Sequence, residues 1–204
     1  MKKFAIAIML LAALLLSACG GKSGEVQIPN VIRYETDEKL IDSGTNYMVT
    51  EVRSKNVTKY SYTVTDPDGN IIESALCAEK PEVSCKDDLV GIRFSDDGHY
   101  FCRYYNIQTK EVSKSFKNAF WDNGKQVAYY SYSNGHIFVV QDIFGDGYYT
   151  EVPVESSSWQ ISVSSAAANG NTLSVDYYES GDKVNAASGH VNLPLPAESP
   201  TPAE

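Results

Sequence analysis

The 204-residue chain has few basic residues, and they form no cluster. Lys and Arg together number 17 against 26 Asp and Glu, which gives a formal net charge of −9 at pH 7. Nucleic-acid binding relies on clustered Lys and Arg side chains, so we expect no DNA or RNA partner. Docking onto anionic lipid headgroups through charge is not expected either, for the same reason.

Sequence motifs of common catalytic sites are missing as well. The chain contains no GxSxG nucleophile elbow, HExxH metal helix, P-loop or GxGxxG loop. Its three histidines, His99, His136 and His190, are scattered. Pairing of Cys102 with His136 as nucleophile and base is the one catalytic arrangement left open. The sequence therefore favours a protein that is not an enzyme and that needs no cofactor.

The longest apolar run, Phe4 to Ala18 (FAIAIMLLAALLLSA), is too short for a stable membrane-spanning helix, which needs about 20 apolar residues. Met1, Lys2 and Lys3 form a short basic segment before it. A basic start, an apolar stretch and small residues at its end are typical of a secretory signal peptide.

The residues at the end of this run, Leu16-Ser17-Ala18-Cys19, resemble the lipobox of bacterial lipoproteins. That resemblance implies that the Cys19 thiol receives a diacylglyceryl group and that a dedicated peptidase cleaves before it. Fatty-acyl chains such as palmitate then anchor the protein through about 0.8 kcal/mol per buried methylene. The predicted location is extracytoplasmic, on the cell membrane or on the outer membrane of a cell with two membranes.

Four segments follow from this reading. Residues 1–18 are the lipoprotein signal peptide, 19–30 a lipidated flexible tether, 31–193 an all-β domain and 194–204 a disordered, Pro-rich tail. Removal of the signal with its two Lys leaves 186 residues with a net charge of −11, which is enough chain for one domain.

Three cysteines remain after lipidation, so at least one stays unpaired inside the chain. Cys77 and Cys85 flank a short loop, and a disulfide between them and a pair of free thiols are both open. Alternation predicts that Tyr100, Cys102 and Tyr104 share one strand face, with Cys102 as a buried apolar residue. No CxxC pair supports a zinc site.

The mature sequence predicts an all-β fold, an antiparallel meander of about a dozen short strands forming a β-sandwich or a small propeller-like stack of sheets. Turn signals at 8–12-residue spacing, such as Asp66-Pro67-Asp68-Gly69-Asn70 and Ser133-Asn134-Gly135, separate these strands. The predicted strands are Tyr47–Arg53, Tyr60–Thr65, Ile71–Ala78, Leu89–Phe94, His99–Tyr105, Glu111–Phe116, Gln126–Tyr132, His136–Asp142, Tyr148–Val154, Trp159–Val163, Thr172–Tyr178 and Lys183–Val191. Between Leu89 and Val140, the Ser-Asp-Asp-Gly turn followed by aromatic strand residues resembles the blade hairpins of propeller repeats.

Asp-rich turns are read as backbone structure rather than as a metal site. Asp66/Asp68, Asp96/Asp97 and Asp142/Asp146 do not fit the EF-hand spacing, and Asp is a common turn residue for backbone reasons alone. No metal is predicted.

Three functions remain. The preferred one is a membrane-anchored lipoprotein whose non-catalytic β domain binds a protein or another envelope component. The second is a carbohydrate-binding module, which predicts one exposed patch that includes Trp121, Tyr130, Tyr132 and Tyr149. The third is an envelope enzyme with an unfamiliar site, which predicts a deep pocket with convergent polar groups.

Overall fold

The computed structural model describes residues 36–96, 98–132, 135–145, 147–156, 161–179 and 188–196. The predicted signal peptide, Cys19 and the tether 19–30 lie outside these residues. No helix among the residues described is both long and apolar enough to cross a membrane.

The described residues form four antiparallel sheets, and within each sheet the strands are hydrogen-bonded in chain order. Sheet I contains β1 (Thr36–Ser43), β2 (Tyr47–Ser54), β3 (Val57–Thr65) and β4 (Ile71–Cys77). Sheet II contains β5 (Glu82–Lys86), β6 (Leu89–Asp96), β7 (His99–Asn106) and β8 (Phe116–Lys117). Sheet III contains β9 (Ala119–Asp122), β10 (Gln126–Ser131), β11 (His136–Asp142) and β12 (Tyr149–Val154). Sheet IV contains β13 (Ile161–Asn169), β14 (Thr172–Glu179) and β15 (Ser188–Pro194).

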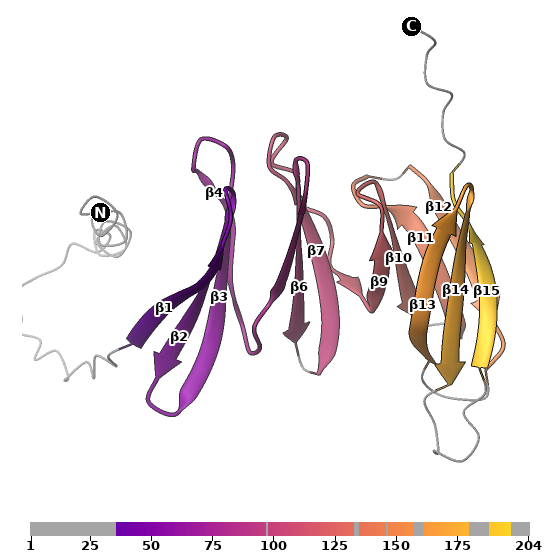
Figure 1. Ribbon diagram of the computed structural model, residues 1–204, viewed down its shortest axis with the longest axis horizontal. Helices are drawn as coiled ribbons and strands as arrows, with labels where there is room; N and C mark the ends of the chain where they lie inside the picture. The colour runs from indigo at the N-terminus through magenta and orange to yellow at the C-terminus, as the bar shows by residue number, and fades with distance from the viewer. Residues whose placement is uncertain are drawn as a thin grey trace, which may run out of the picture. The chain divides into compact units, whose positions relative to one another are not determined.

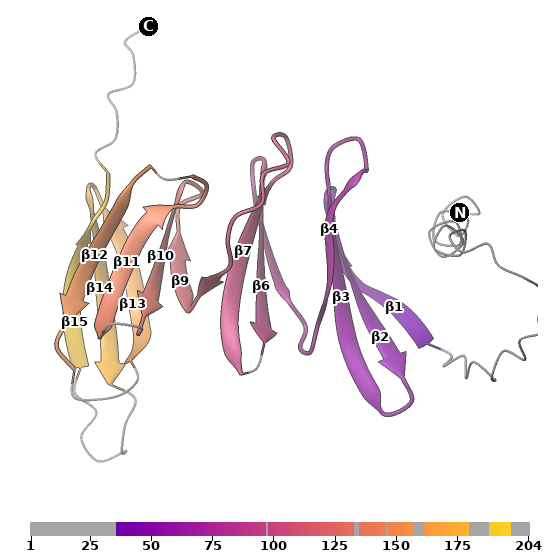
Figure 2. The same ribbon diagram turned by 180° about the vertical axis from the view of Figure 1, so that it is seen from behind.

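The sheets follow one another in chain order (Figure 1), and the view from behind shows the same sequence of layers (Figure 2). The predicted all-β meander is thus confirmed in the form of a stack of small sheets that do not close into a barrel. β15 includes Pro194, which the sequence had assigned to the tail.

Each pair of successive sheets encloses its own hydrophobic core. Strand alternation explains how the inner sheets serve two cores at once, since neighbouring residues point to opposite faces. Tyr105 of β7 is buried against sheet I, whereas the adjacent Tyr104 is buried against sheet III. Val127 and Ala128 of β10 divide in the same way between sheets II and IV. The adjacent Tyr104 and Tyr105 therefore mark β7 as a strand buried on both faces.

In the turn between β3 and β4, the side chain of Asp66 holds the backbone of the turn. Asp66 is buried, and its carboxylate accepts hydrogen bonds from the Asn70 backbone N–H and side-chain amide, both at 2.8 Å. Lys110 Nζ lies 2.7 Å from Asp66 Oδ2. Gly69 takes the positive φ of 84° that this turn needs. The Lys110 and Asn70 hydrogen bonds hold the pKa of Asp66 well below its usual value.

One predicted strand is wrong over most of its length. Of Glu111–Phe116, only Phe116 enters β8, and Val112 makes an isolated bridge to Tyr105. The local reason is Ser113, whose backbone N–H donates to Tyr104 O and whose Oγ accepts from the Tyr104 N–H, both at 2.9 Å. The side chain thereby replaces a ladder bond and interrupts regular pairing.

The outer face of sheet IV carries a pH-dependent interaction. His190 Nδ1 lies 2.7 Å from Asp176 Oδ1, and Ser165 Oγ donates to Asp176 Oδ2 at 2.8 Å. The hydrogen bond to Asp176 raises the pKa of His190 above its usual 6.5. A raised folded-state pKa stabilises the protein fully below 6.5, and the contribution is lost as the pH rises through the pKa of His190.

We therefore expect His190→Gln to lower the melting temperature slightly at pH 6 and not at pH 9, because the pair is solvent-exposed and weak. Thermal melts of both proteins across that range measure the difference. An equal difference at both pH values would show that the ion pair contributes nothing.

Candidate binding groove

The face of sheet II that is directed at sheet III carries an unusual set of polar and aromatic side chains. Residues that pair directly across antiparallel strands lie on the same face. The register places Glu82, Arg93 and Cys102 in one cross-strand row. Ser84, Gly91 and Tyr104 form the row two positions along the strands, which therefore lies on the same face. Ser95 and Tyr100 form a third row on that face, two positions beyond Arg93 and Cys102 in the other direction. The predicted shared face of Tyr100, Cys102 and Tyr104 is thus confirmed.

Arg93 is the centre of this face. Its Nη2 donates to the Ala119 backbone carbonyl of β9 at 3.1 Å, which links sheet II to sheet III. Its Nη1 lies 3.8 Å from Glu82 Oε2, and its guanidinium carbon lies 5.8 Å from the centre of the Tyr100 ring. The Arg93 side chain remains 45% exposed, so these contacts leave part of its donor fork open to a ligand.

Two cavities meet at Arg93 and Glu82, and we call them together the Arg93 groove. The larger has a volume of about 420 Å³, and β9 forms its wall with Ala119, Phe120, Trp121 and Asp122. The smaller, about 220 Å³, is lined by Glu79, Lys80, Phe94, Ser95 and Tyr100 in addition to the shared pair. The volume of the larger cavity is in the range of small-molecule sites.

The floor of the larger cavity is well ordered by hydrogen bonds. The buried Tyr104 hydroxyl donates to Asp122 Oδ2 at 3.0 Å, joining the two sheets. Burial, followed by the proximity of Cys102 and Asp122, raises the pKa of Tyr104 far above its usual value. Gly91 leaves room for the side chains of Ser84 and Tyr104. A Cβ at this position would lie 2.6 Å from Ser84 Oγ and 3.2 Å from the Tyr104 ring.

Cys102 does not meet the requirements of a nucleophile. Burial raises the pKa of its thiol to about 11, so the reactive thiolate is scarce at neutral pH. The side chain packs against the II–III core beside Tyr104. His136, the predicted base, is hydrogen-bonded through Nδ1 to Tyr130 at the end of β10. The structure thus gives the two residues different partners.

The other cysteines are free thiols in the structure. Cys77 pairs with Tyr60 across β3 and β4, whereas Cys85 lies near Tyr47, which pairs with Val64. The four residue steps from Tyr60 to Val64 span about 13 Å. A disulfide needs Cα atoms within about 7 Å, so the Cys77–Cys85 bridge stays a prediction for the alkylation experiment below.

Alkylation should distinguish the three thiols. Burial raises the pKa of Cys77 to about 11, as it does for Cys102, whereas Cys85 is exposed. We expect iodoacetamide at pH 8 to modify Cys85 first and the other two only on unfolding, as read by peptide mass spectrometry. A Cys77–Cys85 peptide that resists alkylation without reductant would contradict this.

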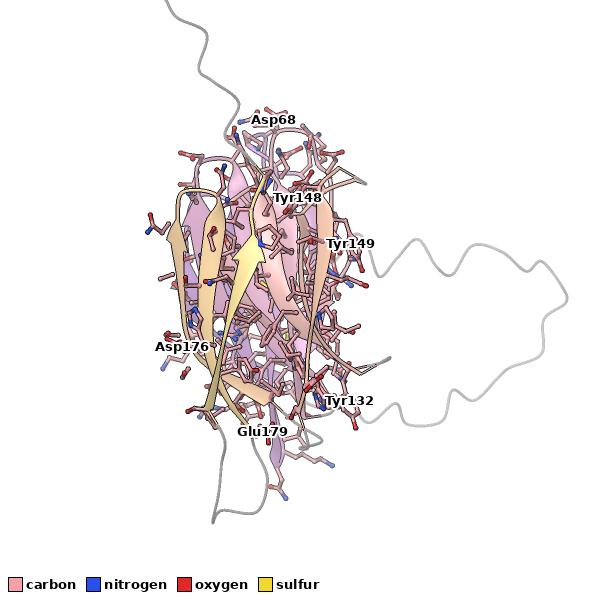
Figure 3. All side chains as sticks on the ribbon, turned by 90° about the vertical axis from the view of Figure 1, so that its right-hand side faces the viewer. Asp68, Tyr132, Tyr148, Tyr149, Asp176 and Glu179 are labelled. Atoms are coloured by element: carbon pink, nitrogen blue, oxygen red, sulfur yellow. The ribbon has the colours of Figure 1, made fainter. Side chains whose placement is uncertain are left out.

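The predicted aromatic patch is not formed. Tyr130 is buried in the III–IV core, and the half-buried Trp121 packs against the same core. Tyr132 and Tyr149 are exposed at 55% and 57%, but they lie toward opposite ends of sheet III, as Figure 3 shows. Of this set, only Trp121 borders the Arg93 groove, from β9, and its side chain packs against the III–IV core.

The sequence did not predict that one site would combine Arg93, Glu82, Tyr100, Tyr104 and Asp122. The available signal was Arg93 itself, a cation inside the apolar strand Leu89–Phe94. In the part of the chain that the structure describes, no three His, Cys, Asp or Glu side chains are placed to hold a metal ion.

No protein-family model matches this sequence, and no curated protein matches it.

Proposed function

We propose that the protein is a membrane-anchored extracytoplasmic lipoprotein, acylated at Cys19, whose non-catalytic β domain binds an envelope component in the Arg93 groove. The lipobox Leu16-Ser17-Ala18-Cys19 supports the anchoring. The groove supports the binding role, and the observation that carries it is the half-exposed Arg93 beside the Glu82 carboxylate and the Tyr100 ring.

Binding fits the groove better than catalysis does. Nucleophilic catalysis needs an activated group within hydrogen-bond reach of a base. Cys102 is the thiol of the groove, and its raised pKa keeps it protonated. Tyr104 likewise stays protonated, and its hydroxyl donates a hydrogen bond to Asp122. It therefore links the two sheets at the groove instead of acting as a base.

The anchoring is tested by Cys19→Ala in a bacterial host that processes lipoproteins. We expect the parent protein in the membrane fraction, released by detergent, with a diacylated amino-terminal peptide detected by mass spectrometry. The variant should appear in the soluble or secreted fraction, because the thioether cannot form. An unmodified mature parent protein in the medium would reject the proposal.

The non-catalytic role is tested with a panel of ester, peptide, phosphate and glycoside substrates. We expect no turnover above that of Cys102→Ala or His136→Ala protein, because neither residue is activated in the structure. Turnover that either substitution abolishes would show that the domain is an enzyme.

A further inference from the structure

We propose that the outer face of sheet I, the face directed away from sheet II, is the interface of a dimer in which two copies of this chain pack face to face. The dimer is independent of the Arg93 groove, which lies on the face of sheet II directed at sheet III.

Strand alternation separates the two faces of sheet I. Val49, Tyr62 and Cys77 point into the core that sheet I shares with sheet II. Their neighbours in each strand therefore point outward. The apolar side chains that the register places on this outer face are Leu40, Met48, Val52, Val57, Ile71 and Leu76.

The outer face of sheet I holds most of the exposed aliphatic side chains of the described residues. Ile71 is 67% exposed, Leu76 65% and Leu40 55%. Elsewhere in the part of the chain that the structure describes, the exposed large apolar side chains are Val112 and four tyrosines. Clustered exposed aliphatic side chains mark an interaction site.

The outer face of sheet IV, at the other end of the strand order, is built differently. Ser174, Asp176, His190 and Asn192 form a hydrogen-bonded network on it. Stacked architectures need a polar outer face at each end to stay soluble as monomers. Sheet IV meets this requirement, whereas sheet I does not.

The charge of the outer face of sheet I favours a second copy as its partner. Glu38 and Lys59 are the charged side chains that the register places on it, and their charges cancel. Hydroxyl side chains such as Thr50, Ser61 and Thr63 lie between the apolar ones. Two copies can thus meet here without the repulsion that a net charge of −9 imposes elsewhere.

The same residues make a lipid surface a poor partner. Interfacial membrane sites are built with Trp and Tyr rings and with several Lys or Arg side chains. Among the described residues of this outer face, none is aromatic and Lys59 is the one cation.

The area of the face is sufficient for a weak dimer. Its four strands have eight, eight, nine and seven residues. At the usual strand spacing and rise they cover about 500 Å². Two such faces bury about 1,000 Å² in total, the lower limit of a specific interface, so we expect micromolar affinity.

The pattern of the face is self-complementary. Leu40, Thr50, Ser61 and Leu76 form one cross-strand row over the four strands. A two-fold axis parallel to the strands, between β2 and β3, places Leu40 of each copy opposite Leu76 of the other. The hydroxyls of Thr50 and Ser61 meet in the same way, as an isologous interface requires.

Sedimentation velocity measures the dimer on the mature chain, residues 19–204, with Cys19→Ala so that no detergent micelle adds mass. Between about 1 and 200 µM, we expect a shift from monomer to dimer with a Kd on the order of 10 µM. Salt from about 0.05 to 0.5 M should leave the Kd unchanged or lower it, because it screens the repulsion between acidic copies. A monomer at every concentration, or a Kd that rises about tenfold with salt, would overturn the proposal.

Variants locate the interface. Leu76→Glu should raise the Kd by at least about tenfold, because each copy then buries an unpaired carboxylate. Tyr178→Glu is the matched control, since it adds the same charge to an exposed position on the outer face of sheet IV. Its Kd should stay within about twofold of the parent value. Equal effects of the two substitutions would place the contact elsewhere and overturn the proposal.

A charge swap tests the two-fold arrangement. Leu40→Lys combined with Leu76→Glu should restore the dimer that Leu76→Glu alone loses, because opposite charges then meet across the interface. Within one copy the two positions lie about 14 Å apart, three strand spacings, so they form no internal pair. Circular dichroism confirms that each variant is folded. A folded double variant that stays monomeric would overturn the two-fold packing.

Vesicles of phosphatidylethanolamine and phosphatidylglycerol in equal parts test the alternative partner. We expect the Cys19→Ala chain to stay in the supernatant when these vesicles are sedimented. Co-sedimentation that Leu76→Glu abolishes, in a protein that is otherwise monomeric, would assign the face to a lipid surface and overturn the dimer.

Discussion

Phe138→Ala should lower the free energy of unfolding by about 3–5 kcal/mol, the range for removing a fully buried Phe side chain. Phe138 has no exposed surface and lies in the core between sheets III and IV. Its ring centre lies 5.6 Å from that of Phe120, 5.7 Å from Tyr130 and 5.5 Å from Tyr177. Truncation therefore leaves a cavity lined by three rings that are fixed by their own strands.

Urea titration followed by circular dichroism and by tryptophan fluorescence measures this loss. Tyr178→Ala is the control, because Tyr178 is 45% exposed on sheet IV and its removal should cost less than about 0.5 kcal/mol. A loss below about 1 kcal/mol for Phe138→Ala would mean that the III–IV core collapses around the cavity or is not formed in solution.

Strand positions were largely predictable, because two-residue alternation and turn chemistry both act locally. The predicted His136–Asp142 coincides with β11, and Ile71–Ala78 exceeds β4 by one residue. The missed strands are β1, β5 and β9. β1 carries Asp37, Glu38 and Lys39 on a sheet edge, where charges are tolerated and hide the apolar pattern.

The groove was not predictable in the same way, because it depends on which sheets face each other. Alternation correctly placed Tyr100, Cys102 and Tyr104 on one face of a strand. It could not show that Glu82 and Arg93 lie in register with Cys102, since this depends on the pairing of β5, β6 and β7. The wall formed by β9 comes from a different sheet altogether.

The prediction of one exposed aromatic patch was wrong for a related physical reason. Tyr is equally suited to a buried sheet face and to an exposed one, because its ring is apolar and its hydroxyl polar. Tyr130 has a partner for its hydroxyl in His136 and is buried, whereas Tyr132, two residues on, is exposed. Composition does not distinguish a buried tyrosine from an exposed one. The distinction depends on how sheet IV packs on sheet III.

Arg103 provides the second large effect, at the opposite face of β7. Its Nη1 lies 2.7 Å from Glu73 Oε1 of sheet I, and its Nε and Nη2 donate to Ser115 Oγ at 3.0 and 2.8 Å. Both charged side chains are mostly buried, with 30% and 23% of their surface exposed. Arg103→Met removes the cation and leaves the Glu73 carboxylate unpaired between two sheets.

We expect Arg103→Met to lower the free energy of unfolding by about 2 kcal/mol, less than the 3–5 kcal/mol of a fully buried pair because water reaches part of it. Glu73→Gln should cost about 1 kcal/mol, since the amide keeps a hydrogen bond. The double variant should lose less than the sum, with a coupling energy of about 1 kcal/mol in a double-mutant cycle. Strict additivity would show that the pair does not couple sheets I and II, and that their attachment depends on the apolar core around Tyr62 and Tyr105 alone.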